Sequence, residues 1–315
     1  MRNTFSDILY EIATQDPRVY VVVSDISPAG SMAKFREEFP DRFINTGVAE
    51  QAMIGICAGL AREGAIPFAY TIAAFSILRP YEFIRDDIAL ANLKVNIVGI
   101  GAGLVYSTLG PTHHTIEDVG IMSMLPNIKI FSPSDTNEVR AGMKILLSES
   151  SDRNYPTYIR LGKAGEPELP LKENIQDLES KGFRFIRKHL DSEILFLSYG
   201  LCVHHVLKLS ETLVNLKQIK SDVISMPMVN TWNVDAILKT FSKYRYIAII
   251  EEHLDIGSLG AQLELTFSKQ LPNVQFIRFN LGGNFVNGYG QFEDITQGTD
   301  ISLNHMLTRL DQVIK

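Results

Sequence analysis

The chain has 315 residues, of which 45% are hydrophobic and 21% are charged, and its formal net charge is −6 at pH 7. This balance is typical of a globular protein, and the length suits two domains of ordinary size. An acidic chain gives no electrostatic reason to expect nucleic acid or an anionic membrane as a partner. No apolar run is long enough to span a membrane and the N-terminus has no signal-peptide pattern, so we expect a cytoplasmic protein.

Helical and strand patterns alternate along the first half of the chain. Apolar spacing predicts a helix over residues 4–15, and the run Val19–Val23 predicts a buried parallel strand. A strand at 42–45 precedes a helix over 52–61, which is apolar almost all round and is therefore expected to be buried. Further strands are predicted at 66–71, 95–100, 127–131 and 157–160, with helices at 75–92 and 136–147. This rhythm predicts a doubly wound parallel sheet.

The composition changes over residues 163–182, which read as a connection between domains. A second α/β pattern follows, with strands predicted at 194–198, 223–225, 246–251 and 274–277 and helices at 202–216, 234–242, 258–269 and 300–313. We therefore predict an α/β protein of two doubly wound domains, residues 1–175 and residues 183–315.

The motif Gly47-Val48-Ala49-Glu50-Gln51 joins a predicted strand to a predicted helix. A carboxylate at the start of a helix is stabilised by the helix dipole, and a lone Glu in that place is usually an ordinary first-turn residue. A second motif, Gly110-Pro111-Thr112-His113, changes that interpretation because the pair is specific. Together they resemble the pyrimidine-binding domain of transketolases and 1-deoxyxylulose-5-phosphate synthases, in which the Glu holds the aminopyrimidine ring of thiamine diphosphate.

The resemblance covers essentially the whole chain, since Ser198-Tyr199-Gly200 and Glu251-Glu252-His253 match the family's smaller C-terminal domain. The family's remaining part, a diphosphate-binding domain, carries a Gly-Asp-Gly motif and a distant Asn that hold magnesium. No Gly-Asp-Gly occurs in this sequence. The resemblance therefore implies one subunit of a split transketolase. Its partner subunit would hold Mg²⁺ (or Ca²⁺) and the diphosphate, in an α2β2 assembly, and no metal ligand is expected on this chain.

The resemblance also assigns roles to single residues. Glu50 would hydrogen-bond the aminopyrimidine and set its tautomer, so it is expected to bind the cofactor and to be catalytic. Phe75 and Tyr81 lie where the family stacks an aromatic residue on the ring, although each also reads as a core aromatic. His113 would contact the donor's hydroxyl groups and assist proton transfer.

Two further polar residues are expected near the site. His114 stands where many family members have Gln, and it is a candidate for supporting substrate binding. Asp25, in the turn after the first strand, matches a family Asp near the thiazolium and also fits a plain turn.

Three positions depart from the family pattern. Leu109 replaces an Asp that contacts the acceptor's C2 hydroxyl, and a phosphate-contacting Ser and His fall at Ala29 and Gly101. These replacements offer no side-chain hydrogen-bond donor, so part of the family's sugar-phosphate pocket is missing. A different acceptor is therefore expected.

Basic residues for an anionic substrate remain. Arg2 lies where the family has an arginine, and Arg160 or Lys163 is expected to replace a second; spacing does not choose between them.

The predicted function is therefore transfer of a two-carbon ketol unit from a ketose or 2-oxo acid donor to an aldehyde or ketone sugar acceptor. One alternative is the β subunit of a 2-oxo acid dehydrogenase, a family that lacks the Gly-Pro-Thr-His motif. A second is a deoxyxylulose-phosphate-synthase-like enzyme that decarboxylates pyruvate. A third is a non-catalytic half-chain that only binds its partner, against which the intact Glu50 and His113 argue.

Overall fold

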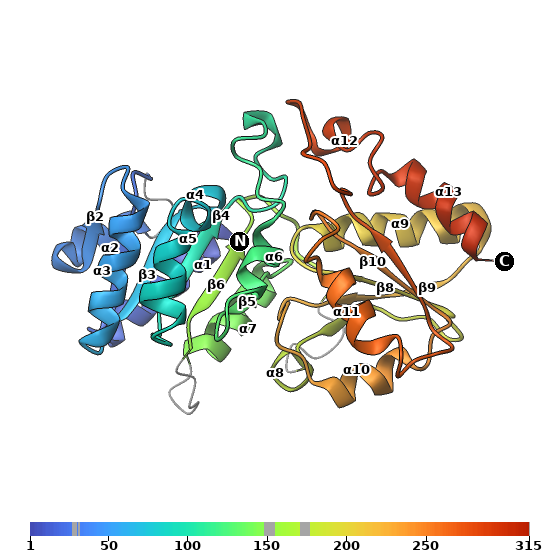
Figure 1. Ribbon diagram of the computed structural model, residues 1–315, viewed down its shortest axis with the longest axis horizontal. Coiled ribbons are helices and arrows are strands. Elements are labelled where there is room, and N and C mark those ends of the chain that lie inside the picture. The colour runs from blue at the N-terminus through green and yellow to red at the C-terminus, as the bar shows by residue number, and fades with distance from the viewer. Residues whose placement is uncertain (27–29, 31, 148–154, 171–176, 315) are drawn as a thin grey trace.

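The computed structural model describes residues 1–26, 30, 32–147, 155–170 and 177–314, and its two halves lie side by side (Figure 1). Six described strands of the first half form a parallel sheet in the order β2-β1-β3-β4-β6-β5. The strands are β1 (Val19–Val23), β2 (Phe43–Asn45), β3 (Ile66–Ile72), β4 (Asn96–Ile100), β5 (Lys129–Phe131) and β6 (Thr157–Leu161). Each predicted strand of this half is confirmed.

Helices cover both faces of the first sheet. One face carries α1 (Arg2–Gln15), α2 (Met32–Glu38) and α7 (Thr136–Leu147). The other carries α3 (Glu50–Arg62), α4 (Ala73–Ile77), α5 (Tyr81–Phe83), the π-helix η2 (Ile84–Ala89) and α6 (Asp118–Ser123). Two 3₁₀ turns, η1 (Pro40–Arg42) and η3 (Ser107–Leu109), lie in the connections. Successive strand residues such as Val21 and Val22 enter opposite cores because side chains alternate along a strand.

The prediction that the helix over 52–61 is buried all round is wrong for its outer face. Met53, Ile54 and Cys57 face the sheet and are fully buried, whereas Ala52 and Ile56 are exposed. The helix lies between the sheet and the outside of the chain, so only one of its faces meets a packed layer.

The helix predicted over 75–92 is interrupted. It consists of α4, a break at Leu78–Pro80, α5 and η2. Proline has no N–H to donate to the preceding turn, and Pro80 stands at this break. π-Helical turns are often found at functional sites, and this one follows the segment that carries Phe75.

Five described strands of the second half form a sheet in the order β11-β10-β8-β9-β7. They are β7 (Arg184–Arg187), β8 (Ile194–Ser198), β9 (Ser221–Ser225), β10 (Tyr246–Ile250) and β11 (Gln275–Phe279). All pair in parallel except β7, which runs antiparallel to β9 at the edge and was not predicted. The α/β fold of two successive units is confirmed, with a mixed sheet in the second.

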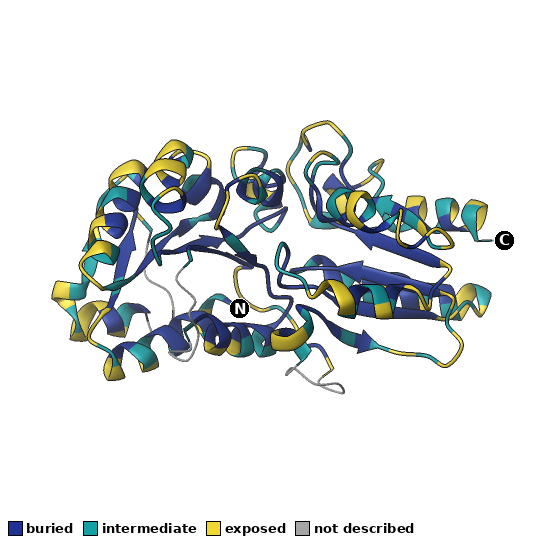
Figure 2. Cartoon of the chain, turned by 60° about the horizontal axis from the view of Figure 1, so that its bottom comes forward, coloured by how far each residue is buried: buried dark blue, intermediate teal, exposed yellow. Residues whose placement is uncertain are grey.

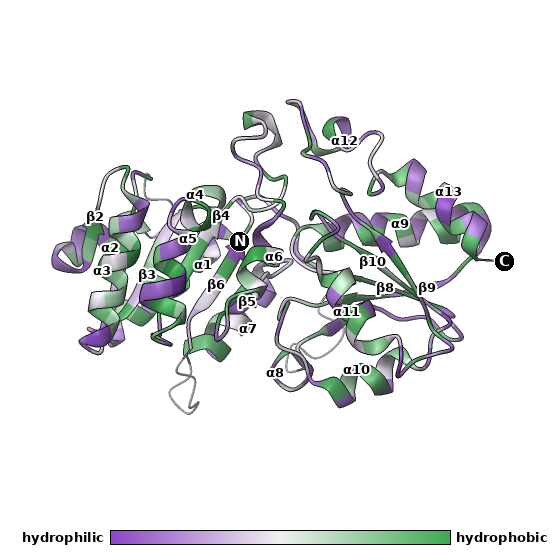
Figure 3. Ribbon diagram, viewed as in Figure 1, coloured by the Kyte–Doolittle hydropathy of each residue, from purple (hydrophilic) through white to green (hydrophobic). Residues whose placement is uncertain are grey.

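The second sheet also lies between helices, and its strands are mainly buried (Figure 2). One face carries α9 (Cys202–Lys217) and α13 (Leu303–Val313), and the other carries α10 (Val234–Phe241) and α11 (Leu259–Phe267). The short helices α8 (Asp177–Lys181) and α12 (Phe292–Ile295) lie at its margins. Hydrophobic and hydrophilic residues alternate along α13, as one buried and one exposed face require (Figure 3).

The two units are joined by hydrogen bonds and by a shared core. The Ser132 amide donates to the carbonyl of Pro227 at 2.8 Å, and the Gly120 amide donates to Nε2 of the fully buried His253 at 3.0 Å. One apolar cluster runs from the α3 side of the first sheet into the α10 and α11 side of the second. The proposed boundary at residue 175 lies outside the described residues, so the domain limits stay a prediction. Cys57 and Cys202 are free and buried, as predicted.

Candidate active site

The predicted site residues gather where the strands of the first sheet end. Asp25 follows β1, Glu50 follows β2, Phe75 follows β3 and His113 follows β4. The carboxyl ends of β1 and β3 are level, because Val23 pairs with Tyr70. The sheet extends from β1 in both directions, and open α/β sheets bind ligands at the carboxyl ends of the strands beside such a switch point.

Glu50 is the first residue of α3, and it is only 3% exposed. A tight turn at Gly47 comes just before this helix and positions Glu50. Gly47 has a left-handed φ of +65°, its amide donates to Oδ1 of Asn45, and its carbonyl accepts from the Ser24 hydroxyl at 2.7 Å. Glycine adopts this φ without the steric cost that a side chain would bring. The carboxylate therefore lies at the positive end of the helix dipole, shielded from water.

Arg79 is the ion-pair partner of Glu50. Its Nη1 lies 2.7 Å from Oε1 of Glu50, and its Cζ lies 4.1 Å from the centroid of the Phe75 ring. The guanidinium thus fills a slot that has a carboxylate at one edge and an aromatic face on one side. A flat group that donates a hydrogen bond from its edge fits this slot.

His113 closes the same site from the next loop. Its ring meets Phe75 edge-on, with centroids 5.4 Å apart and an interplanar angle of 62°. Thr112 Oγ1 and His113 Nδ1 lie 3.0 Å apart, within hydrogen-bonding distance. The structure therefore brings Glu50, Phe75 and His113 together. Burial lowers the pKa of the neighbouring His114, which is 5% exposed.

Two residues of the site were not singled out from the sequence: Arg79 and Tyr106. The Tyr106 ring lies edge-on to His113, with centroids 6.4 Å apart, and it packs directly on Gly101. A Cβ at Gly101 would lie 2.0 Å from Cε2 of Tyr106. Burial raises the pKa of Tyr106, and the nearby Arg2 acts against that shift. In the sequence, the only sign of this packing is that a bulky aromatic residue, Tyr106, follows Gly101 by a few positions.

Three of the predicted residues, Tyr81, Arg160 and Lys163, have other neighbours in this structure. The Tyr81 hydroxyl donates to the carbonyl of Ile121 at 2.8 Å, so this side chain is directed toward α6. Arg160 is 5% exposed, and its Nε donates to Asp118 at 2.7 Å.

Lys163 is exposed and lines a pocket of about 250 Å³ between the two units. Asp25 is exposed, with a φ of +43°, beside Asn45. Ala29 lies outside the described residues.

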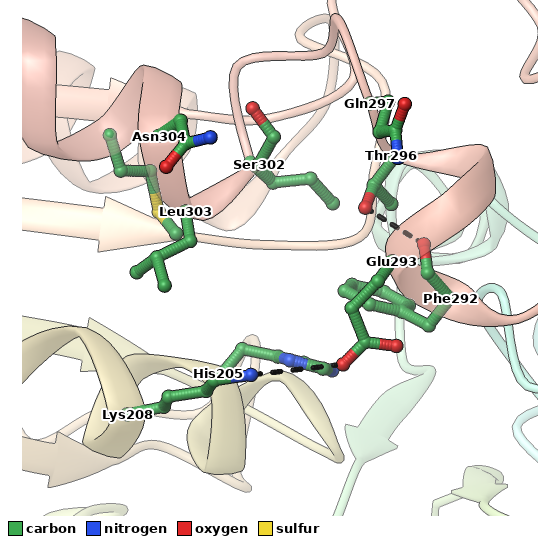
Figure 4. Close-up of a pocket in the computed structure, with 11 residues that line it drawn as sticks. His205, Lys208, Phe292, Glu293, Thr296, Gln297, Ser302, Leu303 and Asn304 are labelled. Atoms are coloured by element: carbon green, nitrogen blue, oxygen red, sulfur yellow. Dashed lines mark hydrogen bonds and ion pairs between the residues drawn. The ribbon is translucent and has the colours of Figure 1, made fainter.

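A second pocket, of about 270 Å³, is lined by residues of the second unit (Figure 4). There His205 of α9 stacks on Phe292 of α12, with centroids 3.9 Å apart. Burial lowers the pKa of His205 to about 4. This pocket is therefore separate from the strand ends that carry Glu50.

The residues of the site would suit the aminopyrimidine part of thiamine diphosphate, because the slot between the Glu50 carboxyl group and the Phe75 ring already holds a flat group, the Arg79 guanidinium. Among the described residues no group of three or more His, Cys, Asp or Glu could hold a metal ion. No helix in the described part of the chain is long and apolar enough to cross a membrane.

Comparisons with known proteins show the family to which the chain belongs. The family model "Transketolase, pyrimidine binding domain" matches residues 1–165, and "Transketolase, C-terminal domain" matches residues 185–281. The chain is 29% identical to a subunit of the apulose-4-phosphate transketolase of Phocaeicola vulgatus, over 88% of this chain and 86% of that protein. It is 30% identical to the 6-deoxy-6-sulfo-D-fructose transketolase subunit SqwH of Clostridium sp. strain MSTE9, over 86% of this chain and 82% of that protein.

Among solved structures, the chain resembles a split gene transketolase described as an inactive beta4 tetramer. The TM-score is 0.82 at 25% identity, over 99% of this chain and 96% of that chain. Two transketolase domains on one chain, with a buried Glu50 beside Phe75 and His113, identify it as a member of the transketolase family and as a subunit of a split transketolase.

Proposed function

We propose that this chain is the subunit that holds the aminopyrimidine of thiamine diphosphate, in a cytoplasmic α2β2 enzyme. The partner subunit holds the diphosphate and Mg²⁺ (or Ca²⁺). The observation that carries the proposal is the slot between Glu50 and Phe75, with His113 edge-on to that ring. Glu50 begins α3 after β2, Phe75 lies in α4 after β3, and His113 lies in the loop after β4, which supports a site at the carboxyl ends of the strands.

Each of these residues has a chemical task. Thiamine diphosphate, when bound, supplies the carbanion-stabilising chemistry that makes and breaks a carbon–carbon bond next to a carbonyl group. Glu50 is buried and would share a proton with the ring edge through a hydrogen bond, and Phe75 would support the ring face. His113 moves a proton to or from a substrate hydroxyl, a role for which imidazole is suited near neutral pH. Asp25, exposed after β1, lies on the same edge of the sheet.

The proposed reaction transfers a two-carbon ketol unit from a ketose or 2-oxo acid to an aldehyde or ketone sugar. Leu109 ends η3 before the Gly110 turn, is 46% exposed, and cannot hydrogen-bond a C2 hydroxyl. Tyr106 fills the space beside Gly101, where the family's phosphate-contacting His would stand. These two positions support an acceptor without a terminal phosphate, such as a nucleotide-activated keto-sugar. Arg2, beside Tyr106, remains available for an anionic group elsewhere on the substrate.

A reconstitution experiment tests the assembly. The chain alone should bind thiamine diphosphate weakly and show no turnover, and adding the partner chain with magnesium should restore turnover. Tight, magnesium-dependent binding by this chain alone, measured by calorimetry, would contradict the division of the site between the two chains. If the reconstituted pair turned over none of the donor substrates, the alternative of a non-catalytic half-chain would be favoured instead.

Substrate screens test the reaction. Turnover of hydroxypyruvate and ketose donors supports ketol transfer, whereas exclusive use of pyruvate would indicate a decarboxylating enzyme. With ribose 5-phosphate as acceptor we expect poor turnover. A kcat/KM of about 10⁴ M⁻¹ s⁻¹ or more, which is ordinary for enzymes, would show that the acceptor proposal is wrong.

A further inference from the structure

Arg79 occupies the slot that the proposed function assigns to the aminopyrimidine ring. Its Nη1 is 2.7 Å from Oε1 of Glu50, and its Cζ is 4.1 Å from the centroid of Phe75. A guanidinium is flat, donates hydrogen bonds from its edge and stacks on aromatic faces. An aminopyrimidine is also flat and would need the same two contacts, a carboxyl group at its edge and an aromatic ring at its face.

We propose that Arg79 is an internal placeholder, which pairs with Glu50 while the slot is free and is displaced when the aminopyrimidine enters. The inference rests on the proposed function. The two groups cannot occupy the same carboxylate edge and the same ring face at once, so binding exchanges the guanidinium for the pyrimidine ring and one proton from solvent, which the ring nitrogen and the Glu50 carboxyl group share. Glu50 therefore has a hydrogen-bond partner in both states, which matters because a buried carboxylate without one is costly.

The surroundings of Arg79 allow the side chain to leave while the backbone stays. The Glu50 side chain is 4% exposed, but that of Arg79 is 43% exposed, so the guanidinium already borders solvent. Its backbone is held, because Gln51 Nε2 donates to the Arg79 carbonyl at 3.5 Å and Pro80 follows in the chain. A long side chain with several rotatable bonds can swing outward about this fixed point.

The exchange has a thermodynamic consequence. If the slot is filled by Arg79 most of the time, the apparent affinity for the pyrimidine equals the intrinsic affinity multiplied by the fraction of time that the slot is free. Removing Arg79 should therefore raise the affinity for the pyrimidine and lower the stability of the ligand-free chain. A residue that simply contacts the cofactor would give the opposite change in affinity.

The test uses the full chain without partner or metal, so that activity is not the readout. The probe is the pyrimidine fragment 4-amino-5-hydroxymethyl-2-methylpyrimidine, titrated by calorimetry or NMR. Arg79→Met should bind it about tenfold more tightly than the wild type, because a charge-assisted hydrogen bond no longer competes. Its thermal midpoint without ligand should be lower. Arg85→Met is the matched control, since Arg85 is 64% exposed and pairs with Asp86 instead.

Chemical rescue separates a placeholder from a general packing effect. In Arg79→Ala, low-millimolar guanidinium chloride should raise the thermal midpoint and compete with the fragment. Sodium chloride at the same concentration should do neither, and the wild type should not respond to either salt.

Where the fragment binds the wild type, two outcomes overturn the placeholder alone: Arg79→Met binds the fragment no more tightly than the wild type, or guanidinium has no effect on Arg79→Ala. The proposed function fails separately. It fails if the fragment binds neither the wild type nor Arg79→Met, or if adding Glu50→Gln to Arg79→Met leaves binding unchanged.

Discussion

Arg184 and Glu138 form an ion pair between the two α/β units in which both side chains are fully buried. The Nε–Oε1 distance is 2.6 Å, and Nη2 of Arg184 also lies 3.4 Å from the buried Asp135. Arg184 comes from the edge strand β7, whereas Glu138 is in the first turn of α7. The pair ties the unpredicted strand of the second sheet to the first unit.

Replacing Arg184 by Met should therefore destabilise the chain strongly. Two carboxylates would be left buried with one partner fewer, and breaking a buried ion pair typically costs about 3–5 kcal/mol. Lys181→Met is the control, because Lys181 pairs with Asp177 at the surface of α8, where such a pair contributes about 0.5 kcal/mol or less. Urea unfolding of the two variants should differ clearly, and equal midpoints would contradict the structural role of Arg184.

Replacing Glu50 by Gln should leave the fold intact and remove most turnover. The amide has nearly the same shape but cannot share a proton with the pyrimidine, and a positioned acid–base group contributes a factor on the order of 100 or more. Kinetics of the reconstituted pair, with circular dichroism as the check on folding, measure this. Glu63→Gln, at the exposed C-terminal end of the same helix, should behave as the wild type. Near-native turnover of the Glu50 variant would refute the assignment.

Replacing Leu109 by Asp should restore discrimination for acceptors that carry a C2 hydroxyl. Leu109 is 46% exposed, so a carboxylate can be placed there at little cost to folding. A site that hydrogen-bonds a hydroxyl can reject analogues lacking it by roughly four to five decades, and a first gain of about tenfold is expected from one introduced group. Ratios of kcat/KM for a 2-hydroxyaldehyde and its 2-deoxy analogue give the measurement. Leu265→Asp, at an 83% exposed position of α11, should leave the ratio unchanged.

The partly buried His205 should make the chain less stable in acid. Its pKa is about 4 in the folded chain, mainly because of burial, against an ordinary value near 6.5. Between these two values the unfolded chain binds more protons than the folded one, so stability falls as the pH falls from 6.5 toward 4. The loss attributable to His205 between pH 7 and pH 5 should be about 2 kcal/mol.

The groups around His205 are Glu293, His204 and Lys208, and its ring stacks on Phe292. A His205→Phe variant keeps an aromatic ring on Phe292 and cannot be protonated. Its urea midpoints at pH 7 and pH 5 should therefore lie closer together than those of the wild type. If the pH dependence of the urea midpoint were unchanged in the variant, groups other than His205 would cause the loss of stability in acid.

The sequence allowed the core strands to be predicted because buried parallel strands are continuous apolar runs, as Val19–Val23 shows. β7 was not predicted because it has only two apolar residues, which lie between Arg184 and Arg187. That pattern is too short to indicate a strand. The exposed face of α3 could not be foreseen, since composition shows how apolar a helix is and not whether a second layer covers it.

The site residues that belong to sequence motifs could be predicted, whereas those that reach the site through tertiary packing could not. Glu50 and His113 belong to motifs, and the fold does place them in one site with Phe75. Arg79 reads in the sequence as a solvated cation on a helix, and only the folded chain shows that it reaches Glu50. The predicted contacts of Tyr81, Arg160 and Lys163 with cofactor or substrate stay predictions, because their side chains have other neighbours in this structure.

The contact between Gly101 and Tyr106 constrains how this site can change over generations. Any side chain at position 101 would collide with the Tyr106 ring, so the two positions cannot be substituted independently. Histidine is among the residue types that tolerate the left-handed φ of +72° found at Gly101, which leaves the ring as the barrier. A lineage that acquired a histidine there would first have to replace Tyr106 with a smaller residue. That intermediate would carry a hole beside His113 and would have neither the histidine nor the tyrosine side chain, so the order in which the two substitutions can occur is constrained.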